Sequence, residues 1–180
     1  MLNMSNSFPV LESRRLLLRQ IIDTDLEAIY KGLSHPEIIQ YYGVQFSNLE
    51  ATKEQMNWYS NLENTRTGIW WAICSKKENH FLGAAGLNNI KDTKAEIGFW
   101  LYPEHWRQGI MKEAVTLILD YAFHMMRLEI IEGYVETENS ICKQALQKMG
   151  FQLHETLLDC EIKNGKTISL GVFLKEFNKD

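Results

Sequence analysis

The residues from Arg107 to Lys112 have the types and the spacing that an anion-binding site requires. They read Arg-Gln-Gly-Ile-Met-Lys and open the longest predicted helix of the chain. The first backbone N–H groups of a helix have no acceptor within it and lie at the positive end of its dipole. Gly109 carries no Cβ that would keep an anion off the backbone, and the two cations add charge. We expect a phosphorylated ligand here; the alternative is an ordinary turn with solvated cations.

The phosphate-binding motifs of other nucleotide-binding folds do not occur in the sequence. A P-loop requires GxxxxGK[ST], and a dinucleotide-binding fold requires GxGxxG directly after a strand. The segment Gly83-Ala84-Ala85-Gly86 lacks the first glycine pair and falls inside a predicted strand. The sequence therefore argues against nucleotide hydrolysis and nicotinamide chemistry.

Composition narrows the class of protein further. The 180 residues carry a formal net charge of −4, so no broad positive surface is expected for nucleic acid. The five histidines show no paired spacing such as HExxH, and the three cysteines form no CxxC pair, so we predict no metal site. An odd number of cysteines fits a reducing compartment, and Leu16 to Leu18 is too short for a signal or membrane segment. We expect a cytoplasmic protein.

The elements that must position the anion site follow from hydrophobic periodicity. Strands are predicted over 15–22, 69–75, 81–89, 95–102 and 129–135, with a terminal hairpin over 151–162 and 167–177 around Asn164-Gly165. Helices are predicted from Thr24 and from Ser47, which both have capping-box spacing, over 109–126, and after an Asn139 cap. Strand, helix and strand over 95–135 predict two parallel strands with a right-handed crossover. The sequence contains no linker or repeat, so we expect one α+β domain over residues 1–180.

Two side-chain placements follow from the same periodicity. Alternation places Glu96, Gly98, Trp100 and Tyr102 on one face of the strand over 95–102. Four large apolar side chains are predicted to fill the core, namely Trp70, Trp71, Met125 and Met126.

The segment from residue 96 to 114 resembles motif A of the GNAT acetyltransferase superfamily. The phosphate turn of this family is written Arg/Gln-x-x-Gly-x-Gly/Ala, and this chain has Trp106, Gly109 and Met111 at its three specified positions. Only the central glycine, Gly109, follows the general form. The stretch Trp106-Arg-Gln-Gly-Ile-Met-Lys-Glu-Ala114 instead resembles the RimJ/RimL branch, the ribosomal-protein N-acetyltransferases and their relatives. Further matches are Arg15-Leu-Leu-Leu-Arg19, Asp120-Tyr121-Ala-Phe123, and Asn139 eleven residues before Gly150-Phe151. The resemblance covers about residues 12 to 177.

This resemblance implies a three-layer α/β fold and a bound acetyl-CoA. In the family, a twisted mixed sheet flanked by helices has a central parallel pair of strands that splay apart and leave a slot for the acyl donor. The pantetheine arm would pair with the backbone of Phe99, Trp100 and Leu101. The pyrophosphate would take the N–H groups of Arg107, Gln108, Gly109, Ile110, Met111 and Lys112, and Asn139 would contact the arm from the other side.

Acetyl transfer to an amine needs a group that removes a proton from the amine. The resemblance suggests Glu96, because many relatives use a glutamate on this strand, acting through water. It also suggests Glu161 in the penultimate strand, where RimL-like enzymes carry a glutamate that has been proposed as the base. The alternative for each is a solvated or salt-bridged strand residue.

The proton donor to the leaving thiolate is less well defined by the resemblance. The usual GNAT tyrosine position is Leu146 in this chain, so the tyrosine mechanism is in doubt. RimL-like members place a serine three residues after the asparagine, and here that residue is Cys142. Its thiol could protonate the leaving sulfur, or it could be a small buried apolar side chain.

The sequence thus predicts an acetyl-CoA-dependent N-acetyltransferase that acts on a primary amine, either a protein N-terminus or a small molecule. The alternative is a non-catalytic acyl-CoA-binding or regulatory module. Tyr41, Tyr42 and Phe46 are candidates for the lining of the acceptor pocket, because the corresponding connection borders that pocket in the family. We expect no nucleic acid or membrane partner, and the terminal hairpin could pair with a second copy.

Overall fold

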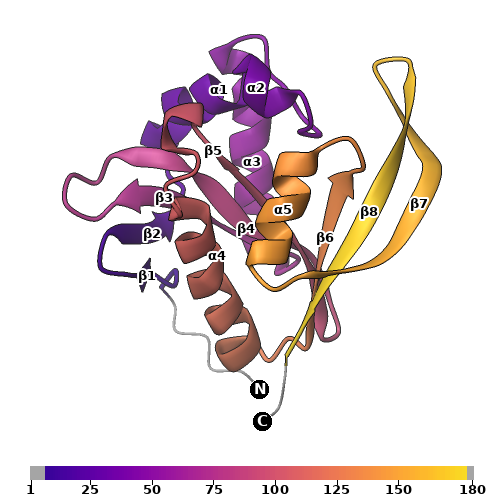
Figure 1. Ribbon diagram of the computed structural model, residues 1–180. Helices are drawn as coiled ribbons and strands as arrows, with labels where there is room; N and C mark the ends of the chain where they lie inside the picture. Colours follow the sequence, from indigo (N-terminus) through magenta and orange to yellow (C-terminus); the bar gives the residue numbers. More distant parts are fainter. Residues whose placement is uncertain (1–6, 178–180) are drawn as a thin grey trace.

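The computed structural model describes residues 7–177, which form an eight-stranded mixed sheet with helices on both faces (Figure 1). The strand order is β1-β2-β3-β4-β5-β6-β8-β7. The strands are β1 (Leu11–Glu12), β2 (Leu16–Gln20), β3 (Ile69–Ser75), β4 (Phe81–Lys91), β5 (Lys94–Leu101), β6 (Ile130–Glu136), β7 (Gln152–Lys163) and β8 (Lys166–Glu176). The α-helices are α1 (Leu26–Leu33), α2 (Pro36–Ile39), α3 (Leu49–Thr65), α4 (Ile110–Asp120) and α5 (Ser140–Lys148).

Alternation along the central strands produces two separate cores, one on each face of the sheet. Trp71, Ala85 and Ile97 belong to the core that packs against α4 and α5. Trp70, Ala84 and Trp100 belong to the core under α1 and α3. Figure 1 shows α4 and α5 in front of the sheet and α3 behind it. The expected mixed sheet with helices on both faces is confirmed, and Trp70 and Trp71 are core residues as predicted.

The sheet opens between its two parallel strands. β5 and β6 are paired only over Lys94↔Ile130, Ala95↔Ile131 and Glu96↔Glu132. β5 continues to Leu101 on the edge of β4, whereas β6 continues to Glu136 on the edge of β8. The expected parallel pair that splays apart is therefore present, and the opening begins directly after Glu96.

Local structure departs from the predicted elements at four places. Asn48, not Ser47, caps α3, because its Oδ1 accepts from the Ala51 N–H at 2.8 Å. The Thr24 cap is also wrong, since a 3₁₀ turn over Asp23–Asp25 precedes α1. A short helix, α2, was not predicted. The long helix ends in a π-helical turn over Tyr121–Met125, which rotates Met125 outward to 63% exposure, so its predicted core position is wrong.

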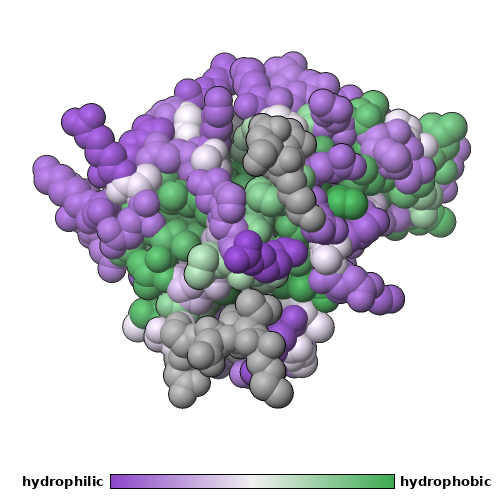
Figure 2. All heavy atoms as spheres, turned by 90° about the horizontal axis from the view of Figure 1, so that it is seen from below, coloured by the Kyte–Doolittle hydropathy of each residue, from purple (hydrophilic) through white to green (hydrophobic). Residues whose placement is uncertain are grey.

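The terminal hairpin forms as predicted around Asn164 and Gly165, which both have positive φ. It extends away from the helices in Figure 1, and its outer strand β7 is one of the two edge strands of the sheet. Apolar residues appear at the surface over this hairpin in Figure 2, where Leu153, Leu158 and Ile162 are more than half exposed. Within residues 7–177, no helix has the length and apolar character needed to span a membrane.

Candidate active site

The turn before α4 has the backbone geometry of an anion site. Arg107 and Gly109 both have left-handed backbone, with φ of 59° and 74°. Gly109 is the N-cap of α4, and the first bond to its carbonyl comes from the Glu113 N–H at 3.1 Å. The N–H groups of residues 110–112 precede that bond and are the ones a helix leaves without an internal acceptor. They stand at the positive end of the α4 dipole.

Arg15, in the connection between β1 and β2, holds this turn in place. The Arg15 guanidinium pairs with the Glu113 carboxylate at 2.5 Å and donates to the Gln108 carbonyl at 2.9 Å. The Gln108 side chain donates to the Glu104 carbonyl at 2.8 Å, so it turns back into the loop. Gln108 can therefore offer a ligand its backbone but not its side-chain amide. Arg15 was not among the predicted site residues, although it belongs to the Arg-Leu-Leu-Leu-Arg segment that is part of the family resemblance.

Space above the turn is open. A Cβ built on Gly109 has a single neighbour within 4 Å, the Arg15 guanidinium at 3.4 Å. Arg107, Gln108 and Lys112 are exposed, Met111 is half-buried, and Ile110 is buried in the core. Ile110 and Met111 can thus contribute backbone N–H groups, while Arg107 and Lys112 can also contribute charge. These residues fit a pyrophosphate.

The backbone of β5 beyond Glu96 faces the opening at alternate residues. Tyr102 donates its N–H to Leu82 in β4, and the Thr93 carbonyl accepts from Glu129 on the β6 side. Because the backbone N–H and carbonyl groups of successive strand residues point to opposite sides, the odd-numbered residues of β5 point these groups toward the opening. Ile97 and Phe99 are two such residues. The Leu101 carbonyl also points there, but it accepts from Trp106 Nε1 at 2.9 Å.

Trp100 differs from its two neighbours in this respect. It pairs with Ala84 of β4, so its own N–H and carbonyl point away from the opening. Of the predicted contacts Phe99, Trp100 and Leu101, Trp100 thus turns its backbone polar groups away, and the Leu101 carbonyl already accepts from Trp106. Phe99 is the residue best placed to pair with a ligand in the opening. The Trp100 side chain lies on the α3 face of the sheet.

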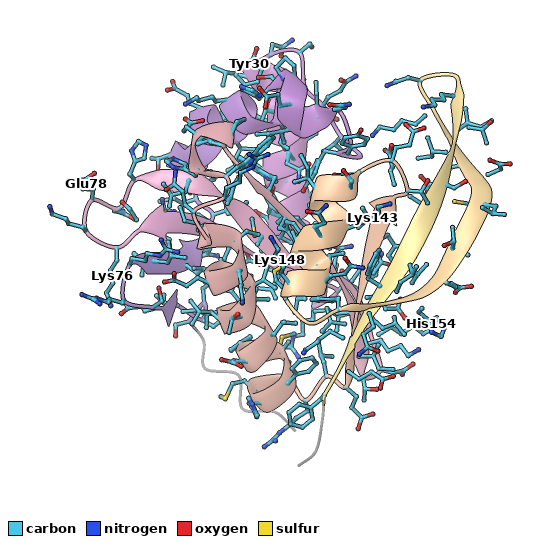
Figure 3. The ribbon with its side chains drawn as sticks, viewed as in Figure 1. Tyr30, Lys76, Glu78, Lys143, Lys148 and His154 are labelled. Atoms are coloured by element: carbon cyan, nitrogen blue, oxygen red, sulfur yellow. The ribbon has the colours of Figure 1, made fainter. Side chains whose placement is uncertain are left out.

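Asn139 stands at the start of α5, on the other side of the opening. Its Oδ1 accepts from the Cys142 N–H at 3.0 Å, so it is a helix cap. Its amide nitrogen has no bonded partner among the described residues and can still donate. Figure 3 places Lys143 and Lys148 on the same helix.

Glu96 lies half-buried at the point where the strands part. Asn88 Nδ2 is 3.4 Å from its carboxylate, and Glu132 is its neighbour across the parallel pair. Tyr134 donates to Glu132 at 2.9 Å. The pKa of Tyr134 is raised to about 12, chiefly by burial. The hydrogen bond to Glu132 and the negative charges of Glu96 and Glu155 raise it further. Carboxylates therefore gather on the α3 face beside the opening.

Glu161 is exposed and is not brought together with Glu96. Glu96 is aligned through Glu132 with Leu174 of β8, and Glu161 is paired with Ile168 of the same strand. Leu174 and Ile168 are an even number of residues apart, so the two glutamates lie on the same face of the sheet. Six residues of β8 separate these positions, which is on the order of 20 Å along the strand.

Cys142 lies in the first turn of α5 and packs against the core beside the opening. Burial raises the pKa of its thiol to about 11. Such a thiol is protonated at neutral pH, but it releases a proton less readily than an ordinary thiol. A role as proton donor stays a prediction, and burial makes it a poor one.

The connection from α2 to α3 covers the α3-side core next to β5. Tyr42 and Phe46 pack on that core. Lys163, at the end of β7, donates to the Gln40 carbonyl at 3.2 Å and pairs with Glu136 at 2.6 Å. The tip of the terminal hairpin is thereby tied both to the end of β6 and to this connection. No cluster of three or more potential metal ligands occurs among residues 7–177.

Comparison with known proteins places these features in a family context. The family model described as an acetyltransferase (GNAT) domain matches residues 15–152. An uncharacterized N-acetyltransferase, YoaA of Bacillus subtilis, is 34% identical over 169 residues, covering 92% of this chain and 96% of the relative.

Two solved structures share the fold at low sequence identity. The acetyl transferase of Salmonella typhimurium that modifies the N-terminal serine of a 50S ribosomal subunit protein has a TM-score of 0.86 at 17% identity, covering 94% of this chain and 100% of that one. The spermidine N-acetyltransferase of Vibrio cholerae, in complex with CoA and spermine, has a TM-score of 0.80 at 20% identity, covering 91% and 96%.

Proposed function

The chain belongs to the GNAT acetyltransferase family, and from that premise we propose that it transfers an acetyl group from acetyl-CoA directly to a primary amine. Enzymes of this family use acetyl-CoA as the acyl donor. The fold it shares with ribosomal-protein acetyltransferases is in keeping with the RimJ/RimL resemblance. We propose that residues 1–180 act as one catalytic domain.

The observation that carries the proposal is the opening between β5 and β6. Pairing stops after Glu96↔Glu132 while both strands continue, and the Phe99 N–H and carbonyl face the space between them. An extended pantetheine arm carries amide groups that can pair with such a strand edge. The turn before α4 begins at the far end of the same strand, so one ligand can engage both sites.

The donor-binding roles follow from this placement. The N–H groups of residues 110–112 and the charges of Arg107 and Lys112 would bind the pyrophosphate. Gly109 keeps the backbone accessible, and Arg15 holds the turn through Glu113 and the Gln108 carbonyl. The free amide nitrogen of Asn139 would donate to the arm from the α5 side. Acetyl-CoA supplies the thioester that the amine attacks.

The chemical roles are assigned to the groups beside the opening. An N–H on β5, with Phe99 the best placed, would stabilise the negative charge that develops on the thioester oxygen. Glu96 would accept the proton of the amine, directly or through water, because it lies half-buried where the strands part. Glu161 is the second candidate for the base. Cys142 is not required, because a thiolate is a good leaving group at neutral pH.

An acetyl-transfer assay tests the proposal. Purified protein is incubated with acetyl-CoA and a panel of peptides, amino acid amides and polyamines, and CoA release and acetylated product are both measured. Product in step with CoA release is expected for at least one amine. Tight binding of acetyl-CoA without transfer to any amine would refute the catalytic assignment and favour a binding module.

A further inference from the structure

Arg15 reaches the turn before α4 from outside the segment that forms this turn. Its Nε pairs with the Glu113 carboxylate at 2.5 Å, and its Nη2 donates to the Gln108 carbonyl at 2.9 Å. A guanidinium group has five N–H donors, so these two bonds do not use them all. Among the described residues none accepts from Nη1, and the side chain is 49% exposed. Arg15 therefore has donors left for a ligand.

The remaining donors of Arg15 border the space that Gly109 leaves free. A Cβ built on Gly109 would have one neighbour within 4 Å, and that neighbour is Arg15 Nη2 at 3.4 Å. The same space gives an anion access to the N–H groups of residues 110–112. An anion oxygen placed there would therefore come within hydrogen-bonding reach of the guanidinium.

A cavity on this side of α4 gives a ligand room. Its volume is about 390 Å³, and it is lined by Ser13, Gly109, Lys112, Glu113, Thr116 and Leu117. All of these residues except Ser13 belong to α4 or to its N-cap. The connection between β1 and β2, which contains Ser13 and Arg15, thus supplies the other wall of the cavity.

The connection between β1 and β2 is itself fixed in place. Lys76, labelled in Figure 3, pairs with Glu12 at 2.7 Å and donates its backbone N–H to the Arg15 carbonyl at 2.8 Å. Ser13 Oγ accepts from the Leu16 N–H at 3.0 Å. β1 and β2 also contact α4 (Figure 1). A ligand would therefore meet a guanidinium that is already positioned, which lowers the entropic cost of binding.

Glu113 makes a cation necessary at this place. Its carboxylate lies in the first turn of α4, where it would repel an anion bound at the helix N-terminus. Burial raises the pKa of this carboxyl group, but hydrogen bonds from Ser13 and Arg15 outweigh burial and lower it, so the group is ionised at neutral pH. Arg15 directs Nε toward Glu113 and Nη2 toward the space above Gly109. It can thus neutralise the carboxylate and still present N–H groups to an anion.

We propose that Arg15 donates directly to the diphosphate of the acyl donor, so that the connection between β1 and β2 forms one wall of the donor site. This inference rests on the proposed function, because acetyl-CoA carries the diphosphate, and it adds a binding residue from outside residues 107–112. A planar guanidinium can bind two phosphate oxygens at once, which the Lys112 ammonium cannot do with the same geometry. The alternative is an Arg15 that affects the donor only by holding the turn.

Two variants that break the same ion pair separate direct contact from support of the turn. Arg15→Met removes the guanidinium, whereas Glu113→Gln leaves it in place and removes a negative charge. Isothermal titration measures the affinity of each variant for CoA. Arg15→Met should weaken binding about tenfold to a hundredfold, as expected for a lost charge-assisted hydrogen bond. Glu113→Gln should bind CoA at least as tightly as the wild type, because Arg15 keeps its bond to the Gln108 carbonyl.

Two further variants control for charge and for shape. Arg14→Met removes the exposed neighbouring arginine and should change the affinity for CoA by less than about twofold, because exposed charges are screened by salt. Arg15→Lys keeps the charge without the planar group and should recover part of the lost affinity. In transfer assays, Arg15→Met should lower kcat/KM for acetyl-CoA and leave it unchanged for S-acetylpantetheine, which has no phosphate.

The outcomes distinguish this inference from the proposed function. Equal losses of CoA affinity in Arg15→Met and Glu113→Gln would show that Arg15 only supports the turn. Unchanged affinity in Arg15→Met, an equal loss in Arg14→Met, or a parallel loss of kcat/KM for S-acetylpantetheine would also overturn the direct contact. A wild-type protein that binds no CoA would instead refute the proposed function itself.

Discussion

Replacing Gly109 with alanine should have two separately measurable effects, a loss of stability from backbone strain and a loss of affinity for CoA. Gly109 has a φ of 74° with only the Arg15 guanidinium within 4 Å of an added Cβ, so the new methyl fits the free protein. Left-handed backbone costs an L-residue roughly 1–2 kcal/mol. Each kcal/mol corresponds to a Tm decrease of about 2–4 °C in a chain of this size.

The methyl group would also stand where an anion must approach the N–H groups of α4. Losing one charge-assisted hydrogen bond costs about 1.5–3 kcal/mol, so the affinity for CoA should fall roughly tenfold to a hundredfold. Isothermal titration with CoA measures this loss, and differential scanning calorimetry measures the strain.

Gly165→Ala is the matched control. Gly165 has a φ of 76° in the terminal hairpin, and no atom lies within 4 Å of an added Cβ. The Gly165→Ala variant has the same backbone strain far from α4. Its Tm should therefore fall by a similar amount, while its affinity for CoA stays at the wild-type value. The reasoning fails if Gly109→Ala binds CoA as tightly as the wild type, or if both variants lose affinity equally.

Three further outcomes follow from the site. Glu96→Gln should lower kcat about 100-fold or more with CoA affinity unchanged in titration, and an equal loss in Glu161→Gln alone would move the base to Glu161. Burial raises the pKa of Cys142 to about 11, so its alkylation, followed by peptide mass spectrometry, should accelerate only as pH rises toward that value; rapid labelling at pH 7 would contradict the burial argument. Lys163→Met should destabilise the fold by about 1–3 kcal/mol in urea unfolding, because it leaves the Glu136 carboxylate, 12% exposed, without its partner. Lys166→Met, on the same hairpin, breaks an exposed pair with Glu138 and should leave stability unchanged; equal effects would show that Lys163 is an ordinary surface residue.

Periodicity and turn chemistry predict most of the fold because they are local. The alternation in β5 places Glu96 and Trp100 on one face, and Asn164-Gly165 marks the hairpin turn that forms. The failures have local causes too. Asn48 and Ser47 are both good caps, and only the backbone geometry selects between them. The π-helical turn that exposes Met125 adds a residue to one turn, which a regular helical pattern does not reveal.

The site is predictable where it depends on one segment and unpredictable where several meet. Residues 107–112 lie on a single turn, so the sequence was sufficient to predict the glycine turn and the helix start that the structure shows. Arg15 supports that turn from the connection between β1 and β2, nearly one hundred residues earlier, and no spacing rule connects the two.

The most direct test of the central claim is mass spectrometry of the reaction of the purified protein with acetyl-CoA and a peptide that has a free N-terminus. If the opening between β5 and β6 holds the acyl donor for attack by an amine, the peptide gains one acetyl group for each CoA released. The Glu96→Gln variant should then bind CoA yet form product far more slowly. An unmodified amine in the presence of bound acetyl-CoA, across peptides, amino acid amides and polyamines alike, would contradict the account.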